Sequence, residues 1–237
     1  MRISLHIPVA QYGFVQIDEV DESDVERLYN KYAEKSINLS PTGKLIEAFC
    51  GGQIMYDEAT HTYSWSGEKY LSGSEYAKSF DKPFDAEKIS EAMAKRDGTD
   101  AEALRSQWQL KADISSGYGT ALHAALEMWI KHKEVHPTFQ KPVESFFEGK
   151  DASVFVSEVV VVDHATKQAG RIDLINIVGQ NECVIRDFKT GKMDVPKRKT
   201  YLKQLEFYKG IMEAASWVVK GIYIDHWDGE VWATYDS

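Results

Sequence analysis

The sequence predicts an α/β fold in which a mixed central β-sheet is flanked by helices, with a small β/α element at the N-terminus. Three runs rich in β-branched residues follow one another between 154 and 188, and such near-continuous apolar runs are typical of strands covered on both faces. Segments with helical spacing of apolar residues precede and follow these runs. At 237 residues and 43% hydrophobic, the chain is long enough to bury a full core.

The first fifty residues are expected to form a small appended element. Residues 3–19 alternate well enough for two short strands, and 21–35 combine an acidic capping cluster with one apolar helix face. Residues 36–48 contain a Ser-Pro-Thr-Gly sequence and indicate a connection. We therefore divide the chain into an element over 1–50 and a single domain over 51–237.

The expected elements of that domain follow from their periodicity and turn residues. A hairpin over 54–71 turns at Gly67, and the helices that follow it are predicted over 86–97, 101–112 and 116–133. The three strands are predicted over 154–162, 171–178 and 183–188. A helix over 199–215 and a last hairpin over 217–235, turning at Asp228-Gly229, complete the sheet.

The composition excludes several classes of protein. Two cysteines, Cys50 and Cys183, are too few for a disulfide framework or for a four-thiolate iron–sulfur cluster within one chain. The longest apolar stretches fall short of the roughly 18 residues of a membrane span. The N-terminus lacks the unbroken apolar core of a signal peptide, so we expect a cytoplasmic protein.

Basic residues are concentrated in one part of an acidic chain. The net charge is −9, from 28 Lys and Arg against 37 Asp and Glu. Between Arg186 and Lys209, eight basic residues stand against three acidic ones, a local balance of +5 that leaves −14 elsewhere. Such a basic strip beside carboxylates would hold phosphates. A solvated, lysine-rich helix face explains the strip equally well when it is taken alone.

Two aspartates and a lysine indicate a metal site on the central strands. Asp173 and Asp187 are equally distant from Gln180, so a simple hairpin would set them opposite each other, about 5 Å apart at Cβ. Carboxylates that close raise each other's pKa unless a cation lies between them. Lys189 lies two residues after Asp187, on the same strand face. The group favours Mg²⁺ or Mn²⁺, whereas an ordinary salt bridge of Asp187 with Lys189 or Arg171 is the structural alternative.

Other polar residues become candidate site residues because of their expected positions relative to Asp173 and Asp187. Glu158 on the preceding strand would neighbour Asp173, although a glutamate at a strand edge is nearly as common. His123 lies in an apolar helix segment and is either a metal ligand or a satisfied core histidine paired with Glu127. Gln204 and Tyr208 share one helix face after the basic cluster, which is by itself a weak signal for a phosphate contact.

The order of these motifs is more specific than any one of them. It runs Gly-Thr-x-x-His, a strand glutamate, Gly-x-x-Asp, Asp-x-Lys-Thr-Gly and Gln-x-x-x-Tyr. Over about 54–225 the chain resembles the PD-(D/E)XK nuclease superfamily, in particular its RecB-like branch, which includes phage-type exonucleases. The resemblance implies a restriction-endonuclease-like core. The proline of the motif is replaced by Ile172, and the cysteines of iron–sulfur relatives are missing.

The resemblance also implies roles for individual residues. It makes His123, Asp173, Asp187 and the Phe188 carbonyl ligands of Mg²⁺ or Mn²⁺. It assigns catalysis to Lys189 together with Asp187, Asp173 and Glu158. The DNA-binding residues that we expect are Thr120, Thr190, Lys192, Lys197, Arg198, Lys199, Gln204 and Tyr208.

The activity implied is that of a metal-dependent DNA nuclease of exonuclease type, acting in recombination, repair or phage DNA processing. DNA is the expected partner, with a recombination protein or a helicase as a second one, in a bacterial or phage-infected cytoplasm. Two alternatives stay open. One is a structure-specific endonuclease, and the other is a non-catalytic DNA-binding subunit that has kept the nuclease fold.

Overall fold

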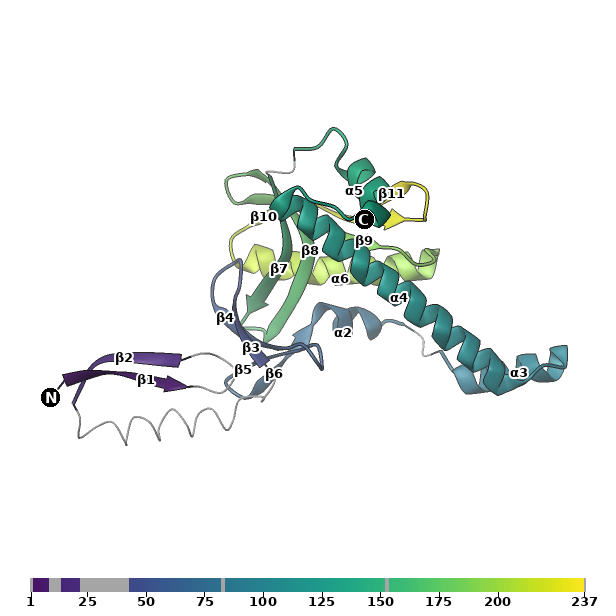
Figure 1. Cartoon of the computed structure of the whole chain (residues 1–237), viewed down its shortest axis with the longest axis horizontal. Coiled ribbons are helices and arrows are strands. Elements are labelled where there is room, and N and C mark those ends of the chain that lie inside the picture. The colour runs from purple at the N-terminus through teal and green to yellow at the C-terminus, as the bar shows by residue number, and fades with distance from the viewer. Residues whose placement is uncertain (1, 9–13, 22–42, 82–83, 152–153, 237) are drawn as a thin grey trace. The chain divides into compact units, whose positions relative to one another are not determined.

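The computed structural model describes residues 2–8, 14–21, 43–81, 84–151 and 154–236 (Figure 1). The chain forms two compact units, one of Met1–Ser72 with Val160–Gly170 and the other of Gly73–Val159 with Arg171–Ser237. Strands β7 (Phe155–Asp163) and β8 (Gln168–Gly179) therefore contribute to both units. Each unit is built around its own cluster of buried side chains.

The first unit consists of strands, most of which are antiparallel. β1 (Arg2–Pro8) and β2 (Phe14–Asp21) pair with each other as a two-stranded sheet. The other strands pair in sequence order and are β3 (Gly43–Glu47), β4 (Gln53–Asp57), β5 (Thr62–Trp65) and β6 (Glu68–Ser72). β6 in turn pairs in parallel with the first residues of β8. The buried cluster of this unit consists of Ala48, Ile54, Tyr56, Tyr63, Tyr70, Val160, Val162 and Ala169.

The strands expected over 3–19 are confirmed, and so is the turn at Gly67 between β5 and β6. The helix expected over 21–35 falls almost wholly outside the described residues. The connection expected over 36–48 is wrong for 43–47, which form β3 against β4. Leu45 and Ile46 stand between charged residues, and two apolar residues alone predict a strand only weakly. Pairing with β4 therefore determines that this segment is a strand.

The second unit holds most of the helices and the central strands. Its helices are α2 (Gly73–Lys78), α3 (Ala86–Asp97), α4 (Ala101–His132), the 3₁₀ helix η2 (Pro137–Phe139), α5 (Gln140–Phe147) and α6 (Val195–Ala214). Its strands, besides parts of β7 and β8, are β9 (Glu182–Lys189), β10 (Val218–Trp227) and β11 (Trp232–Asp236). The predicted helix over 86–97 and the last hairpin are confirmed.

Helix α4 corrects one expectation, because 101–112 and 116–133 belong to one continuous helix of 32 residues. Asp100 caps its start by accepting from the Ala103 amide, and Lys133 ends it in the left-handed region at φ 60°. Ser115, Ser116 and Gly117 do not interrupt it, since serine and glycine cost only about 0.5–1 kcal/mol each in a helix interior. Within the described ranges, no helix has a stretch long and apolar enough to cross a bilayer.

The sheet is mixed, as the sequence predicts. The strands are hydrogen-bonded in the order β11-β10-β9-β8-β6-β5-β4-β3, with β7 beside β8. β8 and β9 are antiparallel, while β9 and β10 are parallel and are connected by α6. Leu174 and Phe188 pack with α4 and α5 on one face. Successive side chains of a strand point to opposite faces, so the buried Ile175 and Ile185 lie on the other face of the sheet. The mixed sheet flanked by helices forms a restriction-endonuclease-like α/β core.

Candidate metal centre and active site

The register of β8 and β9 brings the two predicted aspartates together. Leu174 is opposite Arg186 and Ile175 is opposite Ile185, and the paired positions end there, with Asp173 and Asp187 directly beyond them. This register is the one expected from a turn centred at Gln180. The Asp173 carboxylate also accepts a hydrogen bond of 2.8 Å from the Phe188 amide, which fixes it at the end of β9.

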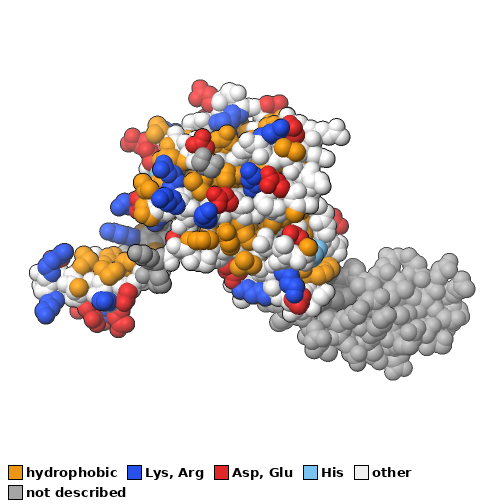
Figure 2. Space-filling model, turned by 180° about the vertical axis from the view of Figure 1, so that it is seen from behind, with side chains coloured by type: hydrophobic (Ala, Val, Ile, Leu, Met, Phe, Trp, Pro, Cys, Tyr) orange, Lys and Arg blue, Asp and Glu red, His pale blue; other side chains and the backbone are white. Residues whose placement is uncertain are grey.

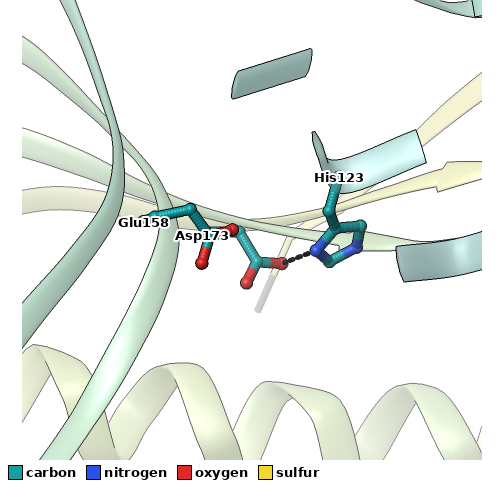
Figure 3. A group of neighbouring side chains, drawn as sticks. All are labelled: His123, Glu158 and Asp173. Carbon is teal, nitrogen blue, oxygen red and sulfur yellow. Dashed lines mark ion pairs between the residues drawn. The ribbon is translucent and has the colours of Figure 1, made fainter. Parts of the chain in front are cut away.

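His123, Glu158 and Asp173 form a cluster from three different elements. One ligand atom of each lies within 4.8 Å of the others. Figure 3 shows the imidazole extending from α4 toward Asp173 on β8, with the Glu158 carboxylate beside them from β7. His123 Nδ1 is 3.7 Å from Asp173 Oδ2. The expected ligands His123 and Asp173 are thus together, and Glu158 is the third member.

The hydrogen bond of the imidazole determines which nitrogen faces the carboxylates. His123 Nε2 lies 3.1 Å from the Phe188 carbonyl oxygen, and because a carbonyl only accepts, Nε2 carries the proton. In the neutral ring Nδ1 then presents a lone pair to the Asp173 oxygen. A divalent cation between Nδ1 and the carboxylate makes this arrangement favourable, as does a proton on Nδ1, which turns the two groups into an ion pair. The geometry and the oxygen-rich donor set therefore fit a hard divalent metal ion.

Glu158 has an unusual backbone conformation for a strand residue. Its φ is 52°, in the left-handed region that costs a non-glycine residue about 1–3 kcal/mol and is enriched at functional sites. Burial and the neighbouring Asp173 raise the pKa of its carboxyl to about 7, against the opposing effects of His123 and Arg171. The Arg171 guanidinium is 3.7 Å away. Strand β7 is therefore bent at Glu158, which adds the third side chain to the cluster.

Asp187 lies outside this cluster of three and pairs with Lys189. Their charged atoms, Oδ2 and Nζ, are 2.5 Å apart, so the lysine ammonium is the partner of this buried carboxylate oxygen. Burial, and then repulsion by Asp173, raise the pKa of Asp187 to about 6, although Lys189 opposes the shift.

The Lys189 ammonium stays charged although it is enclosed. Burial lowers its pKa, but attraction by Asp187 and Asp173 outweighs burial and raises the pKa overall. On its other side the ammonium lies 4.7 Å from the centre of the Tyr201 ring, within cation–π distance. Tyr201 belongs to α6 and was not among the residues expected from the sequence. Its spacing of three and seven residues from Gln204 and Tyr208 places it on their helix face and was the available signal.

Close contacts hold the segment that follows Lys189. A Cβ added to Gly119 on α4 would lie 3.0 Å from Thr190 Oγ1, so the small residue permits a close approach of α4. His226 on β10 lies opposite Lys189 and donates from Nε2 to the Gly191 carbonyl at 2.7 Å. No sequence pattern singled out His226, because its role depends on the β9–β10 register.

The residues expected to contact DNA fall into two groups. Lys192, Lys197, Lys199 and Thr120 are exposed, while Arg198 and Thr190 are partly buried. Gln204 donates to the Tyr208 hydroxyl at 3.0 Å, and the Tyr208 ring is buried against Gly73. A direct contact of that ring with DNA is therefore not expected, and Tyr208 instead anchors Gln204.

One family of known proteins matches the part of the chain that carries this site. Residues 102–225 match the PD-(D/E)XK nuclease superfamily (PDDEXK_1). A solved structure titled "Crystal structure of SSO0001" is similar at 15% identity with a TM-score of 0.36 over 70% of this chain, which spans 65% of that chain. No curated protein matches. Since the family match covers more than half of the chain and includes every residue from His123 to Tyr208, the chain belongs to the PD-(D/E)XK nuclease superfamily.

Proposed function

We propose that this protein is a Mg²⁺- or Mn²⁺-dependent DNA nuclease that hydrolyses phosphodiester bonds. The observation that carries the proposal is the convergence of His123, Glu158 and Asp173 within 4.8 Å, beside the enclosed Asp187–Lys189 pair. The membership of the nuclease superfamily supports the same reaction. Negative charge develops on the phosphate oxygens in the transition state. A metal ion bound by this cluster, together with Lys189, would supply positive charge beside those oxygens.

The metal would be held by His123 Nδ1 and by the carboxylates of Asp173 and Glu158. Asp187 and the Phe188 carbonyl, which the sequence also placed among the ligands, lie next to this group through Lys189 and His123. When bound, the ion would lower the pKa of a bound water and neutralise charge on the phosphate oxygens. The Phe188 carbonyl and amide keep His123 and Asp173 aimed at one point.

Lys189 would act on the phosphate or on the attacking water. Asp187 and Tyr201 bound its ammonium on two sides, so its position is defined before substrate arrives. A fixed positive charge in a buried site orients the nucleophile and stabilises the charge of the pentavalent transition state without reorganisation. The exposed Lys192, Lys197 and Lys199 would guide the DNA strand toward it.

The test of this function compares cleavage by the wild type with cleavage by Lys189→Ala and Asp187→Asn, in Mg²⁺, Mn²⁺ or a chelator. We expect at least about a 100-fold loss of rate in both variants, the usual effect of removing one electrostatic group. Lys220→Ala is the matched control, because Lys220 pairs with Glu182 at the opposite end of the β9–β10 pair. Unchanged cleavage in the first two variants, with circular dichroism showing the fold intact, would refute the assignment.

The finer part of the proposal is exonuclease action in DNA recombination, repair or phage DNA processing. An exonuclease requires an end, so linear DNA labelled at its ends should be degraded while covalently closed circular DNA persists. Cleavage of the closed circle would contradict exonuclease action and would show that the protein is an endonuclease. Metal binding without cleavage of either substrate would instead favour a non-catalytic DNA-binding subunit.

A further inference from the structure

One face of α4 carries a regular apolar seam whose large side chains are exposed. The seam recurs at intervals of four and three residues and consists of Leu110, Ile114, Gly117, Ala121, Ala124 and Met128. This alternation is the a/d pattern of helices that pack side by side. Leu110, Ile114 and Met128 are 60%, 64% and 43% exposed, values far above those of core residues.

The seam lies on the side of α4 that faces away from the active site. Leu122 and Leu126 are fully buried in the core, and Gly119 and His123 face Thr190 and Asp173. At 100° per residue, these four positions lie on the opposite half of the helix from the seam. The packing that holds α4 to its own sheet therefore does not use the seam.

The small residues at the middle of the seam leave room for another helix. A Cβ added to Gly117 would meet no atom within 4 Å. Next to it, Ala121, Ala124, Val135 and Phe139 line an open groove of about 560 Å³. Figure 2 shows further hydrophobic side chains, among charged ones, on the lobe that α3 and the first turns of α4 form at the left of the view.

We propose that the seam binds the same seam of a second copy of this chain, with the two α4 helices antiparallel around a two-fold axis at position 119. Positions 110 and 128, 114 and 124, and 117 and 121 are each symmetric about 119. The axis would therefore bring Gly117 onto Ala121, the closest approach. Ile114 would fill the space over Ala124, and Leu110 and Met128 would close the ends. A seam that is small at the centre and large at its ends is complementary to itself when inverted, as a two-fold interface requires.

Charges beside the seam do not oppose this contact. Asp113 accepts a hydrogen bond of 2.7 Å from Gln109, and Glu127 is paired with Lys131 on its own helix. The Glu127 carboxylate thus has a cationic partner, and the Asp113 carboxylate has a neutral hydrogen-bond donor, before the second helix approaches.

The first experiment measures mass by sedimentation or light scattering. The wild type should have twice the 26.9 kDa of one chain at micromolar concentration. Ile114→Glu should raise the dimer Kd by about 30-fold or more, as the loss of a central interface residue does. Val231→Glu is the control, since Val231 is 61% exposed on the β10–β11 hairpin. A monomeric wild type, or a dimer that Ile114→Glu leaves intact, would overturn the proposal, and neither result depends on nuclease activity.

The second experiment tests the direction of the helices with a short bis-maleimide. Ala121→Cys should cross-link between subunits, because both copies of position 121 lie close to the axis. Leu110→Cys should not, since its two copies would be about 27 Å apart along antiparallel helices. The wild type, with Cys50 and Cys183, is the background control. Efficient cross-linking of Leu110→Cys is the result expected for parallel helices, and it would exclude the antiparallel two-fold arrangement.

Discussion

At the level of single residues, the site depends on groups whose favourable state requires a cation. His123 donates from Nε2 to the Phe188 carbonyl and so turns Nδ1 toward Asp173. Asp173 and Asp187 could be predicted from sequence, because strand register is simple arithmetic once the turn is located. The left-handed conformation of Glu158 could not be predicted from sequence, because the residues next to Glu158 do not by themselves specify a bend in the strand.

The raised pKa values predict how pH and metal act on stability. The carboxyls of Glu158 and Asp187 titrate at about 7 and about 6 in the fold, above their ordinary values. In chelator, their contribution to stability is complete below about pH 4 and is lost as the pH rises through 6 and 7. Because Mn²⁺ competes with protons, its stabilising effect should grow from pH 5.5 to pH 8.

Thermal unfolding with Mn²⁺ and with chelator at both pH values measures this difference. Glu158→Gln should reduce the pH dependence, since it removes the group with the higher pKa. A Mn²⁺-induced shift in Tm that is the same at pH 5.5 and pH 8 would contradict the involvement of these carboxyls.

Tyr201 is predicted to position Lys189 through its ring rather than its hydroxyl. Tyr201→Phe keeps the aromatic face 4.7 Å from the ammonium and should retain kcat within about threefold. Tyr201→Leu keeps the bulk but loses the ring charge distribution, and should lower kcat about 10-fold with little change in KM. Steady-state kinetics on one linear substrate separates the two, and equal losses in both variants would assign the effect to the hydroxyl or to packing.

At the level of elements, the positions of helices explain which residues meet. α4 carries His123 on one face and the apolar seam on the other, and both depend on its running unbroken through Ser115 to Gly117. The sequence indicated a break there, since serine and glycine are poor helix formers, but hydrogen bonding on either side and a core anchored at Leu122 outweigh them.

The contact between α2 and α6 yields a stability prediction. A Cβ at Gly73 would overlap the Tyr208 ring, so Gly73→Ala should lower the free energy of unfolding by about 1–3 kcal/mol. Gly210→Ala on α6 is the matched control, because its Cβ would meet nothing within 4 Å. There the better helix propensity of alanine should stabilise by up to about 1 kcal/mol. Urea unfolding measures both, and equal effects would show that the Tyr208 ring moves aside freely.

At the level of the whole molecule, the division of the chain differs from the one expected at residue 50. β3 lies before that position, but it pairs with β4, and Ala48 belongs to the same buried cluster as Ile54 and Tyr56. β1 and β2, by contrast, pair only with each other among the described strands. The first unit therefore needs residues from 43 onward for its own core.

Two truncations test this boundary. Removing residues 1–42 should change Tm by no more than about 2 °C, whereas removing 1–50 strips β3 from β4 and should lower Tm by at least about 5 °C. Differential scanning calorimetry of both chains decides the matter. A similar Tm for the two truncations would place the boundary at residue 50 after all.

The sequence by itself determined the central strands, the mixed α/β class, the Asp173–Asp187 register and the order of motifs that the superfamily shares. These depend on local periodicity and on turns, which neighbouring residues encode. Only the tertiary structure decided that Tyr201 and His226 support Lys189 and the segment after it, and that Tyr208 is buried. Each of these contacts joins residues from separate elements, so it exists only once the sheet and helices have packed.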